Sequence, residues 1–440
     1  MQAMQAMQAM QALRHPPRPQ AQRGAAALLI TVVLFFTMML AAVYVNRNLV
    51  FEQRSSANQY RSTQAFEAAE AGLEWAASQL NSNQRIGTDC LPAAAPASAF
   101  RERFVAHDPA TARWAGRTWG ASAAALQAAC VRSGAGWSCS CPIDAAPALA
   151  APAGDSVAPA FILKFVGGDK PGVLRVVSTG CTSLAGACAP AAGIAADPPD
   201  ATATVEVSFG LLPAIATLPV AAITLRGTLD AGTASLGLHN PDPATGAAVH
   251  AGATVAAPAA RVTPPAGASP ADGIFEADAV LAATAPERLF AGYFGLDKLA
   301  WKNQPVVRRV TCSGECAGTL AAAVDAGVVY PMLWVAASAG GAVRIAGPVT
   351  LGTPERPVVI VVDGPLQLSG AVRVHGVLYS AALTWTAAPM PGGLLRGAAI
   401  VEGDYGGDAA ADLVYDATLL ASLKAGTGAL VRINGSWRDY

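Results

Sequence analysis

The sequence predicts an α+β protein in which one long amino-terminal helix precedes a large region of short β-strands. Residues 25–71 contain neither glycine nor proline, whereas the whole chain of 440 residues has 43 glycines and 31 prolines. After residue 71 these residues punctuate short apolar stretches, which is typical of strands joined by turns. The chain is 53 % hydrophobic and 13 % charged, with a net charge of −1, so it lacks the basic excess that nucleic-acid binding requires.

Residues 1–24 form a basic segment. Its first twelve residues repeat the triplet Met-Gln-Ala, so Met1, Met4, Met7 and Met10 are each a possible translation start. Arg14, Arg18 and Arg23 follow, and no acidic residue occurs before Glu52. Basic flanks of a membrane helix stay on the cytoplasmic side, so we expect residues 1–24 to be a cytoplasmic leader.

Residues 25–45 have the length and composition of a membrane-spanning helix. They contain no charge over 21 residues, enough to cross a hydrocarbon core of about 30 Å. A removable signal peptide is the alternative, but its apolar core is usually about 7–15 residues long. Residues 46–440 are then expected outside the cytoplasm. The large apolar side chains expected in the membrane helix include Leu28, Leu29, Phe35, Phe36 and Leu40.

The helix is expected to continue to Leu80. Apolar and small residues recur at steps of three, four and seven, which makes one stripe on a helix. This stripe includes Phe66, Ala69, Leu73, Ala76 and Leu80, whereas Glu67, Glu70 and Glu74 lie largely off it. Such a stripe must pack on the chain's own globular region or on neighbouring subunits.

Two features of this helix resemble a known family. Arg23-Gly24 precedes the apolar stretch, and the run QAFEAAEAGLEWA (residues 64–76) follows it. Together they resemble the amino-terminal segment of the PilX-type minor pilins of type IV pili. The more specific part is the run that contains Phe66, Ala69, Glu70, Gly72 and Leu73. The resemblance implies that a prepilin peptidase cuts between Gly24 and Ala25, which makes Ala25 the mature amino terminus.

Two departures from the pilin pattern bear on function. Major pilins usually begin with Phe and carry a glutamate at the fifth mature position, where this chain has Ala25 and Leu29. In the family that glutamate pairs with the amine of an adjacent subunit, and a carboxylate in lipid persists only with such a partner. A chain with Leu29 is therefore poorly suited to a repeating shaft but tolerable at the tip.

The remainder divides into two expected domains. Residues 81–210 are expected to form an antiparallel head that covers the helix stripe, with strands at 161–165, 173–177 and 202–209. Residues 211–440 are expected to form a second β-rich domain. They contain a strand-turn-strand around Gly227, a Pro/Ala-rich loop at 252–272, a short helix within 289–299, and strands separated by glycines after Gly341. Short strands of this kind suit a β-solenoid or a compact sandwich.

The eight cysteines, an even number, all follow the membrane-spanning segment, which suits disulfides in an oxidising compartment. They are Cys90, Cys130, Cys139, Cys141, Cys181, Cys188, Cys312 and Cys316. The short-range candidates are Cys181–Cys188 and Cys312–Cys316. Cys90 and Cys130 would then bond to each other or to the doublet Cys139/Cys141. A zinc site is the alternative, but no second ligand pair lies at finger-like spacing.

Groups that could carry chemistry are scarce. No catalytic or phosphate-binding motif occurs, so the sequence predicts neither an enzyme nor a cofactor. Asp404 and Asp408, in an acidic glycine-rich stretch, are a weak calcium candidate, and a solvated loop is the alternative. Trp385 and Trp437 are candidate exposed aromatic contacts for a ligand.

These patterns and the resemblance lead to one functional hypothesis and two alternatives. The hypothesis is a minor pilin of the bacterial inner membrane that primes pilus assembly and sits at or near the tip. Its partners would be other minor pilins, the major pilin, the prepilin peptidase and an adhesin of the PilY type. The alternatives are a large minor pseudopilin of a type II secretion system, which shares the helix and the missing glutamate, and a single-span anchored periplasmic β protein.

Overall fold

The computed structural model describes residues 23–94, 97–150, 152, 158–184, 188, 201–325, 331–338, 340–388 and 392–440. Of the leader expected over residues 1–24, only Arg23 and Gly24 lie within the described residues. The chain divides into two compact units at Tyr60, and each unit is described by itself.

Helix α1 (Arg23–Leu80) spans 58 residues without interruption, which confirms the long amino-terminal helix. The absence of glycine and proline over residues 25–71 removes the two residue types that most disfavour a helix interior. In the first unit, the described side chains from Ala26 to Tyr60 are all exposed.

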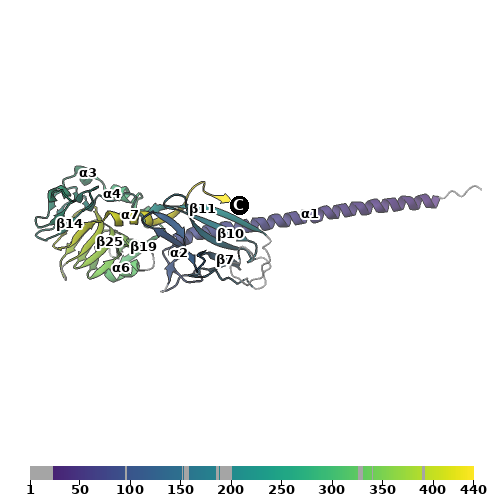
Figure 1. Cartoon of the computed structure of the whole chain (residues 1–440), viewed down its shortest axis with the longest axis horizontal. Helices are drawn as coiled ribbons and strands as arrows, with labels where there is room; N and C mark the ends of the chain where they lie inside the picture. The colour runs from purple at the N-terminus through teal and green to yellow at the C-terminus, as the bar shows by residue number, and fades with distance from the viewer. Residues whose placement is uncertain are drawn as a thin grey trace, which may run out of the picture. The chain divides into compact units, whose positions relative to one another are not determined.

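The second unit contains an antiparallel head, in which β7, β10 and β11 are labelled (Figure 1). Its main sheet has seven strands. Five come from one stretch of chain: β7 (Ala128–Ser133), β8 (Gly136–Ser140), β9 (Ala160–Gly167), β10 (Val173–Cys181) and β11 (Thr202–Pro213). Two more, β30 (Gly428–Arg432) and β31 (Arg438–Asp439), both pair with β11. The chain therefore leaves the head after β11 and returns to it at β30. Residues 428–432 and 438–439, which were expected in the second domain, lie in this sheet.

Short elements complete the head. They are β1 (Arg85–Ile86), β2 (Ser98–Ala99), α2 (Phe100–Phe104), β3 (Val105–Asp108), β4 (Arg113–Gly116), β5 (Thr118–Trp119) and β6 (Ala124–Ala125). Phe100, Phe104 and Phe165 pack ring against ring beneath the main sheet.

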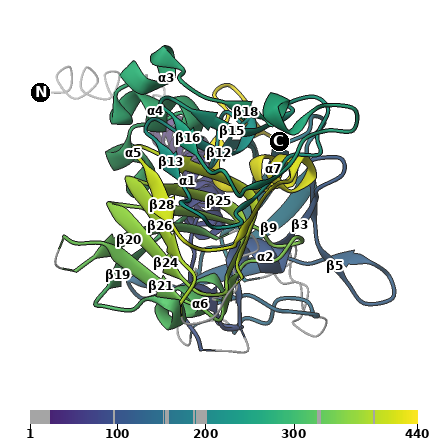
Figure 2. The ribbon, with the colours of Figure 1, turned by 90° about the vertical axis from the view of Figure 1, so that its left-hand side faces the viewer.

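Between β11 and β30 the chain folds into a β-solenoid. Every strand pair in its two sheets is parallel, which is the pattern of stacked coils and excludes a sandwich of antiparallel sheets. Figure 2 shows one sheet as a stack of short strands in the order β16, β13, β28, β26, β24, β21.

The strands of the solenoid follow one another through short corners. The first group is β12 (Ala221–Leu225), β13 (Leu229–Asp230), β14 (Gly237–His239), β15 (Ala247–Ala251), β16 (Val255–Ala256), β17 (Arg261–Thr263) and β18 (Ile274–Phe275). The second group begins with β19 (Val307–Cys312), β20 (Met332–Ala337), β21 (Val343–Ala346), β22 (Val349–Leu351), β23 (Val358–Val362) and β24 (Pro365–Ser369). It ends with β25 (Val372–Ser380), β26 (Ala382–Thr386), β27 (Leu394–Val401), β28 (Tyr405–Gly407) and β29 (Asp412–Tyr415).

Helices interrupt or close the solenoid. They are the 3₁₀ helix η2 (Pro270–Gly273), α3 (Ala279–Ala283), α4 (Pro286–Phe294), α5 (Lys298–Lys302), α6 (Ala317–Val324) and α7 (Ala417–Gly426). The expected helix within 289–299 is thus two helices, separated by Gly295 in the left-handed conformation. The stretch 252–272 is not a loop throughout, because β16 and β17 form part of a coil there.

The coils are not stacked in sequence order. Strand β12 pairs with β15 on one side and with β27 on the other, so the first coil lies against one of the last. The chain winds from β12 to β18 and then starts again at β19, the far end of the same sheet. It finally winds back until β27, β28 and β29 meet β12, β13 and β14.

Two glycines form a corner of the solenoid inside long strands. Gly376 in β25 and Gly397 in β27 have φ values of 145° and 133°, where L side chains are strained. A Cβ on Gly376 would lie 1.9 Å from the Val358 carbonyl oxygen, and one on Gly397 would lie 2.0 Å from that of Gly376. Stacked coils therefore approach too closely here for any side chain.

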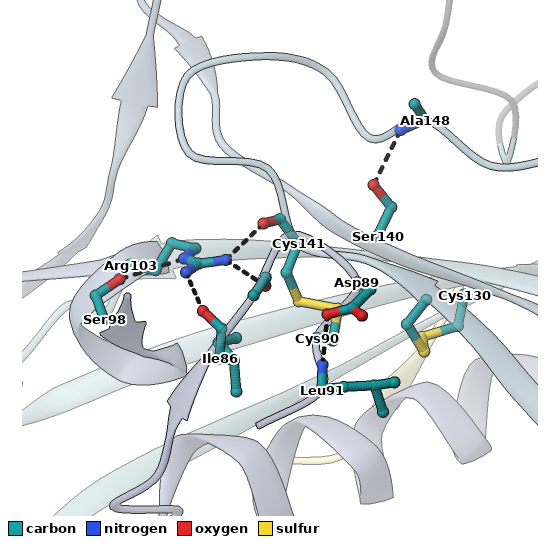
Figure 3. The surroundings of a disulfide bond; sticks show 12 residues. Ile86, Asp89, Cys90, Leu91, Ser98, Arg103, Cys130, Ser140, Cys141 and Ala148 are labelled. Carbon is teal, nitrogen blue, oxygen red and sulfur yellow. Dashed lines mark hydrogen bonds between the residues drawn. A yellow bond between two sulfur atoms is a disulfide. The ribbon is translucent and has the colours of Figure 1, made fainter. Parts of the chain in front are cut away.

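A buried arginine and a disulfide hold the loops at the base of the head (Figure 3). The bond Cys90–Cys141 closes a loop of 51 residues, and Arg103 lies beside it at 5 % exposure. Its guanidinium donates to the carbonyl oxygens of Gly87 and Cys141, both at 2.7 Å, and to that of Ile86. Burial lowers the pKa of Arg103 from its usual value. One charge thus donates to three carbonyl oxygens, which belong to the segment around Cys90 and to Cys141 itself.

Replacing Arg103 tests how much its hydrogen bonds contribute to the stability of the head. We expect Arg103→Met to lower the free energy of unfolding by about 3 kcal/mol or more, because buried carbonyls lose a charged donor. Thermal unfolding of the detergent-solubilised chain measures the change. Arg113→Met is the matched control, since the contacts of the exposed Arg113 to carbonyls are long, at 3.4 and 3.5 Å. Equal shifts for the two variants would contradict this role.

Candidate functional site

The second part of α1, from Arg61 onward, is covered by the head along one face. Ala65, Ala69 and Ala76 are fully buried, and Leu73 and Leu80 nearly so. These residues follow the spacing of the sequence stripe, and several of them join one core with β9, β10 and β11. The sequence predicted that the stripe packs either on the head or on another subunit. In the structure, the antiparallel sheet of the head covers it.

Two glycines allow the helix and the sheet to approach closely. A Cβ on Gly72 would lie 2.4 Å from Ser178 Oγ, and a Cβ on Gly180 would lie 2.1 Å from the Ala65 carbonyl oxygen. Gly72 is in α1 and Gly180 is in β10. Each element therefore lacks a side chain at the point where the other comes closest. The glycine in the run AAEAGLE thus has a packing reason.

Aromatic rings of α1 extend this contact. Trp75 packs edge-on against Phe100 of α2, with ring centroids 5.2 Å apart. Phe66 packs edge-on against Trp437 near the carboxyl terminus, at 6.0 Å. The carboxyl-terminal segment therefore lies against the first turns of the covered part of α1.

The end of α1 is also fixed to strand β30. The Asn81 side chain donates to the Leu430 carbonyl and accepts from the Leu430 amide, both at 2.8 Å. Arg101 donates to the carbonyls of Gly426 and Gly428. Asn81 and Leu430 are 349 residues apart, so no local pattern in the sequence indicates that they pair.

The acidic side chains of this segment stay outside the core. Glu67, Glu70 and Glu74 are exposed, and Glu74 forms an ion pair with Arg432 at 2.6 Å. Glu70, which the sequence analysis grouped with the packing run, therefore lies on the open face of α1, whereas Ala69 and Leu73 face the sheet.

The first part of α1 has the properties of a membrane span. Among the described residues it belongs to one helix long and apolar enough to cross a membrane, with a mean hydropathy of 2.6 over its most apolar window. Leu28, Leu29, Phe35, Phe36 and Leu40 are all more than half exposed in the structure. Gly24 and Ala25 lie in the first turns of α1.

The eight cysteines form four disulfides, and no cysteine is free. The bonds are Cys90–Cys141, Cys130–Cys139, Cys181–Cys188 and Cys312–Cys316. Of the pairings that the sequence left open, each of Cys90 and Cys130 bonds to one member of the Cys139/Cys141 doublet. Three of the bonds lie in the head and one in the solenoid.

The acidic stretch near residue 404 is divided among separate partners. Asp404 accepts from the Thr228 amide and hydroxyl, and Asp408 accepts from the Ala387 amide. Over the part of the chain that the structure describes, no three acidic, histidine or cysteine side chains come together to hold a metal ion. Among the two tryptophans singled out earlier, Trp437 is half exposed, but Trp385 is fully buried in the solenoid and cannot meet a ligand.

The close approach of α1 and β10 can be tested by adding one methyl group. We expect Gly180→Ala to lower the free energy of unfolding by about 1–3 kcal/mol, because the new Cβ collides with helix backbone that cannot yield. Gly318→Ala is the control, since a Cβ there meets nothing within 4 Å on α6. Thermal unfolding of both variants decides, and an unchanged Gly180→Ala protein would contradict the packing described.

Comparison with known proteins finds a match for the amino-terminal segment. Residues 23–74 match the family model described as PilX N-terminal. No curated protein matches the chain. A solved structure, the competence-associated pilin ComZ from Thermus thermophilus, matches with 12 % identity over 86 % of this chain and 98 % of that one. Its TM-score is 0.19, at which the likeness carries no weight for fold or function. Residues 23–74 of this chain are therefore similar to the PilX N-terminal family, in agreement with the resemblance seen in the run QAFEAAEAGLEWA.

Proposed function

We propose that this chain is a minor pilin of a type IV pilus, which primes pilus assembly and remains at or near the tip. The observation that carries the proposal is the PilX N-terminal match over residues 23–74, on a helix that continues unbroken from the apolar stretch into the head. A plain membrane anchor requires only the apolar stretch. It does not require Gly72, which allows α1 to pack closely against β10.

The residue at position 29 supports a place away from the repeating shaft. Leu29 cannot supply the carboxylate that, by the resemblance, neutralises the amine of a neighbouring subunit. An uncompensated charge in lipid is costly, so a subunit above this one would bind poorly. A tip position avoids that cost because nothing lies above it.

The insertion of the solenoid supports a presenting role. The chain leaves the head at β11 and returns at β30, and these two strands pair with each other. The solenoid can therefore be carried without disturbing the helix packing. We propose that its surface presents a partner adhesin of the PilY type. The match to the PilX family favours the pilus over a type II secretion pseudopilin.

Processing by a prepilin peptidase places the amino terminus at Ala25. We expect mass spectrometry of the native protein to find a methylated Ala25 at its start. The variant Gly24→Val should remain uncut, because the bulkier side chain blocks cleavage after residue 24. Arg23→Lys keeps the basic charge and is the control that should still be cut. A native chain that starts between Met1 and Met10 would favour a simple anchored protein.

A priming role predicts fewer pili when the chain is missing. We expect cells that lack it to show a clear loss of surface pili by electron microscopy, restored by the native gene but not by Gly24→Val. The protein should also be present in sheared pili in far smaller amounts than the major pilin. Unchanged piliation together with absence from sheared pili would overturn the proposed function.

A further inference from the structure

A partly enclosed cavity of about 110 Å³ lies where the head meets the solenoid. The head contributes residues from the end of α1, from α2 and from strands β3 and β4. The solenoid contributes Val306 and Met332, and residues 426–428, which lead from α7 back to β30, complete the wall. All of these residues belong to the second unit. A molecule bound in this cavity would therefore contact the head and the solenoid at once.

The larger part of the cavity wall is apolar. Leu80, Val105 and Met332 are each at most 3 % exposed, and Ala99 and Val306 complete this part of the lining. An apolar cavity of about 150 Å³ can hold a benzene ring. The smaller space in this protein therefore suits a branched apolar group of about three or four carbon atoms.

Two buried polar groups in the same wall are unsatisfied. The Trp114 indole N–H and the Thr427 hydroxyl form no hydrogen bond with any described residue, although the two residues are only 5 % and 1 % exposed. Most buried polar groups in folded proteins have a partner, so these two call for one. An indole N–H can only donate, and a hydroxyl can donate as well as accept. A ligand that brings a hydrogen-bond acceptor to this part of the wall satisfies both groups.

Two opposite charges line the cavity without forming an ion pair with each other. Glu102 Oε2 is buried and has no hydrogen-bond partner among the described residues, whereas Oε1 lies 3.7 Å from Arg356. Burial raises the pKa of Glu102, and the charges of Arg356, Arg117 and Arg85 oppose that rise. Arg117 is exposed and forms no ion pair within the described part of the chain. Glu102 and Arg117 are therefore close enough to interact through space but farther apart than a direct ion pair.

The other two titratable side chains of the lining are already engaged. Arg101 donates to the carbonyl oxygens on either side of Thr427, and its guanidinium lies 4.5 Å from the centroid of the Trp114 ring. His107 packs on the same indole, with ring centroids 4.5 Å apart, and burial lowers its pKa, which favours the neutral imidazole. The acid and the exposed arginine that remain have opposite charges, so the cavity favours a ligand without net charge.

We propose that this cavity binds a free α-amino acid with a small branched apolar side chain. The side chain of the ligand occupies the apolar part of the wall. Its carboxylate accepts hydrogen bonds from Trp114 and Thr427 and faces Arg117. Its ammonium group donates to Glu102 Oε2, which forms a charge-assisted hydrogen bond. An α-amino acid carries both charges on one carbon atom, so it can bridge the gap between the acid and the arginine.

Calorimetry and thermal unfolding of the detergent-solubilised full chain test this site, with L-valine as the probe. We expect saturable binding of one L-valine per chain. The unfolding temperature should rise with the concentration of L-valine, because a ligand that binds only the folded state stabilises it. Failure of L-valine to bind saturably would overturn the proposal.

Three analogues of valine test the three parts of the ligand. Isovalerate lacks the ammonium group, isobutylamine lacks the carboxylate, and glycine lacks the apolar side chain. We expect each analogue to bind at least about tenfold more weakly than L-valine, because each loses either a charge-assisted hydrogen bond or the apolar contact. Isovalerate that binds as tightly as L-valine would overturn an amino acid as the ligand.

Variants of the lining test which side chains hold the ligand. We expect Glu102→Gln and Arg117→Gln each to weaken L-valine binding about tenfold, because each removes one charge from the site. Trp114→Phe keeps the ring but removes the indole N–H, and it should weaken binding about fivefold. Arg113→Gln is the matched control, since Arg113 is an exposed arginine of the same strand β4 outside the lining. Binding by Arg117→Gln that equals binding by the control would overturn the site.

Combining variants with analogues separates recognition from a general loss of folding. Glu102→Gln should weaken the binding of isobutylamine but not that of isovalerate, because only the amine contacts Glu102. Arg117→Gln should do the reverse, because only the carboxylate faces Arg117. An equal loss for both analogues in both variants would overturn the assignment of the two charges. None of these measurements depends on pilus assembly, so they test the cavity separately from the proposed function.

Discussion

The close contact between one face of α1 and the antiparallel sheet is the constraint on which the rest of the head depends. The face is made of alanines, leucines and one glycine. Strand β10 has Gly180 at the point where it crosses the helix backbone. Small residues on both sides allow the backbones to approach, and the apolar residues around them exclude water. A larger side chain at either glycine would push the sheet off the helix and expose the stripe that ends at Leu80.

The solenoid is compatible with this contact because of where it is inserted. Strands β11 and β30 are neighbours, so the chain can leave and return at one place in the sheet. Asn81 and Arg101 then fix the returning strand to the end of α1 and to α2. The helix that matches the PilX N-terminal model and the inserted solenoid are therefore separate in structure, although the strands on either side of the solenoid share one sheet.

Much of this could be predicted from local patterns. The helix was visible because glycine and proline are missing over 47 residues, and its buried face because the spacing of three and four matches a helical turn. The strands β9, β10 and β11 and those after Gly341 were visible as short apolar runs bounded by turn residues. The similarity of the amino-terminal segment to the PilX family was visible in one short run.

Other features depend on residues that are distant in sequence, and local patterns do not report them. The solenoid coils have no fixed repeat length and are stacked out of order, since β12 lies between β15 and β27. The sequence around Gly227 predicts a strand, a turn and a second strand. In the structure, the two strands, β12 and β13, belong to two different sheets. The sequence around Trp385 does not indicate whether its side chain is exposed, because the coils that bury it come from other parts of the chain.

By itself, the sequence determined the properties that act over one turn or one strand: the membrane-length helix, its apolar face, the basic charge of residues 1–24 and the strand spacing. The tertiary structure alone decided which cysteine of the Cys139/Cys141 doublet bonds to each of Cys90 and Cys130, which strand closes the head, and that Trp437 packs against Phe66 of α1. The physical reason is that helix and strand formation depend on neighbours a few residues away, whereas these contacts depend on how a whole chain returns to its own surface.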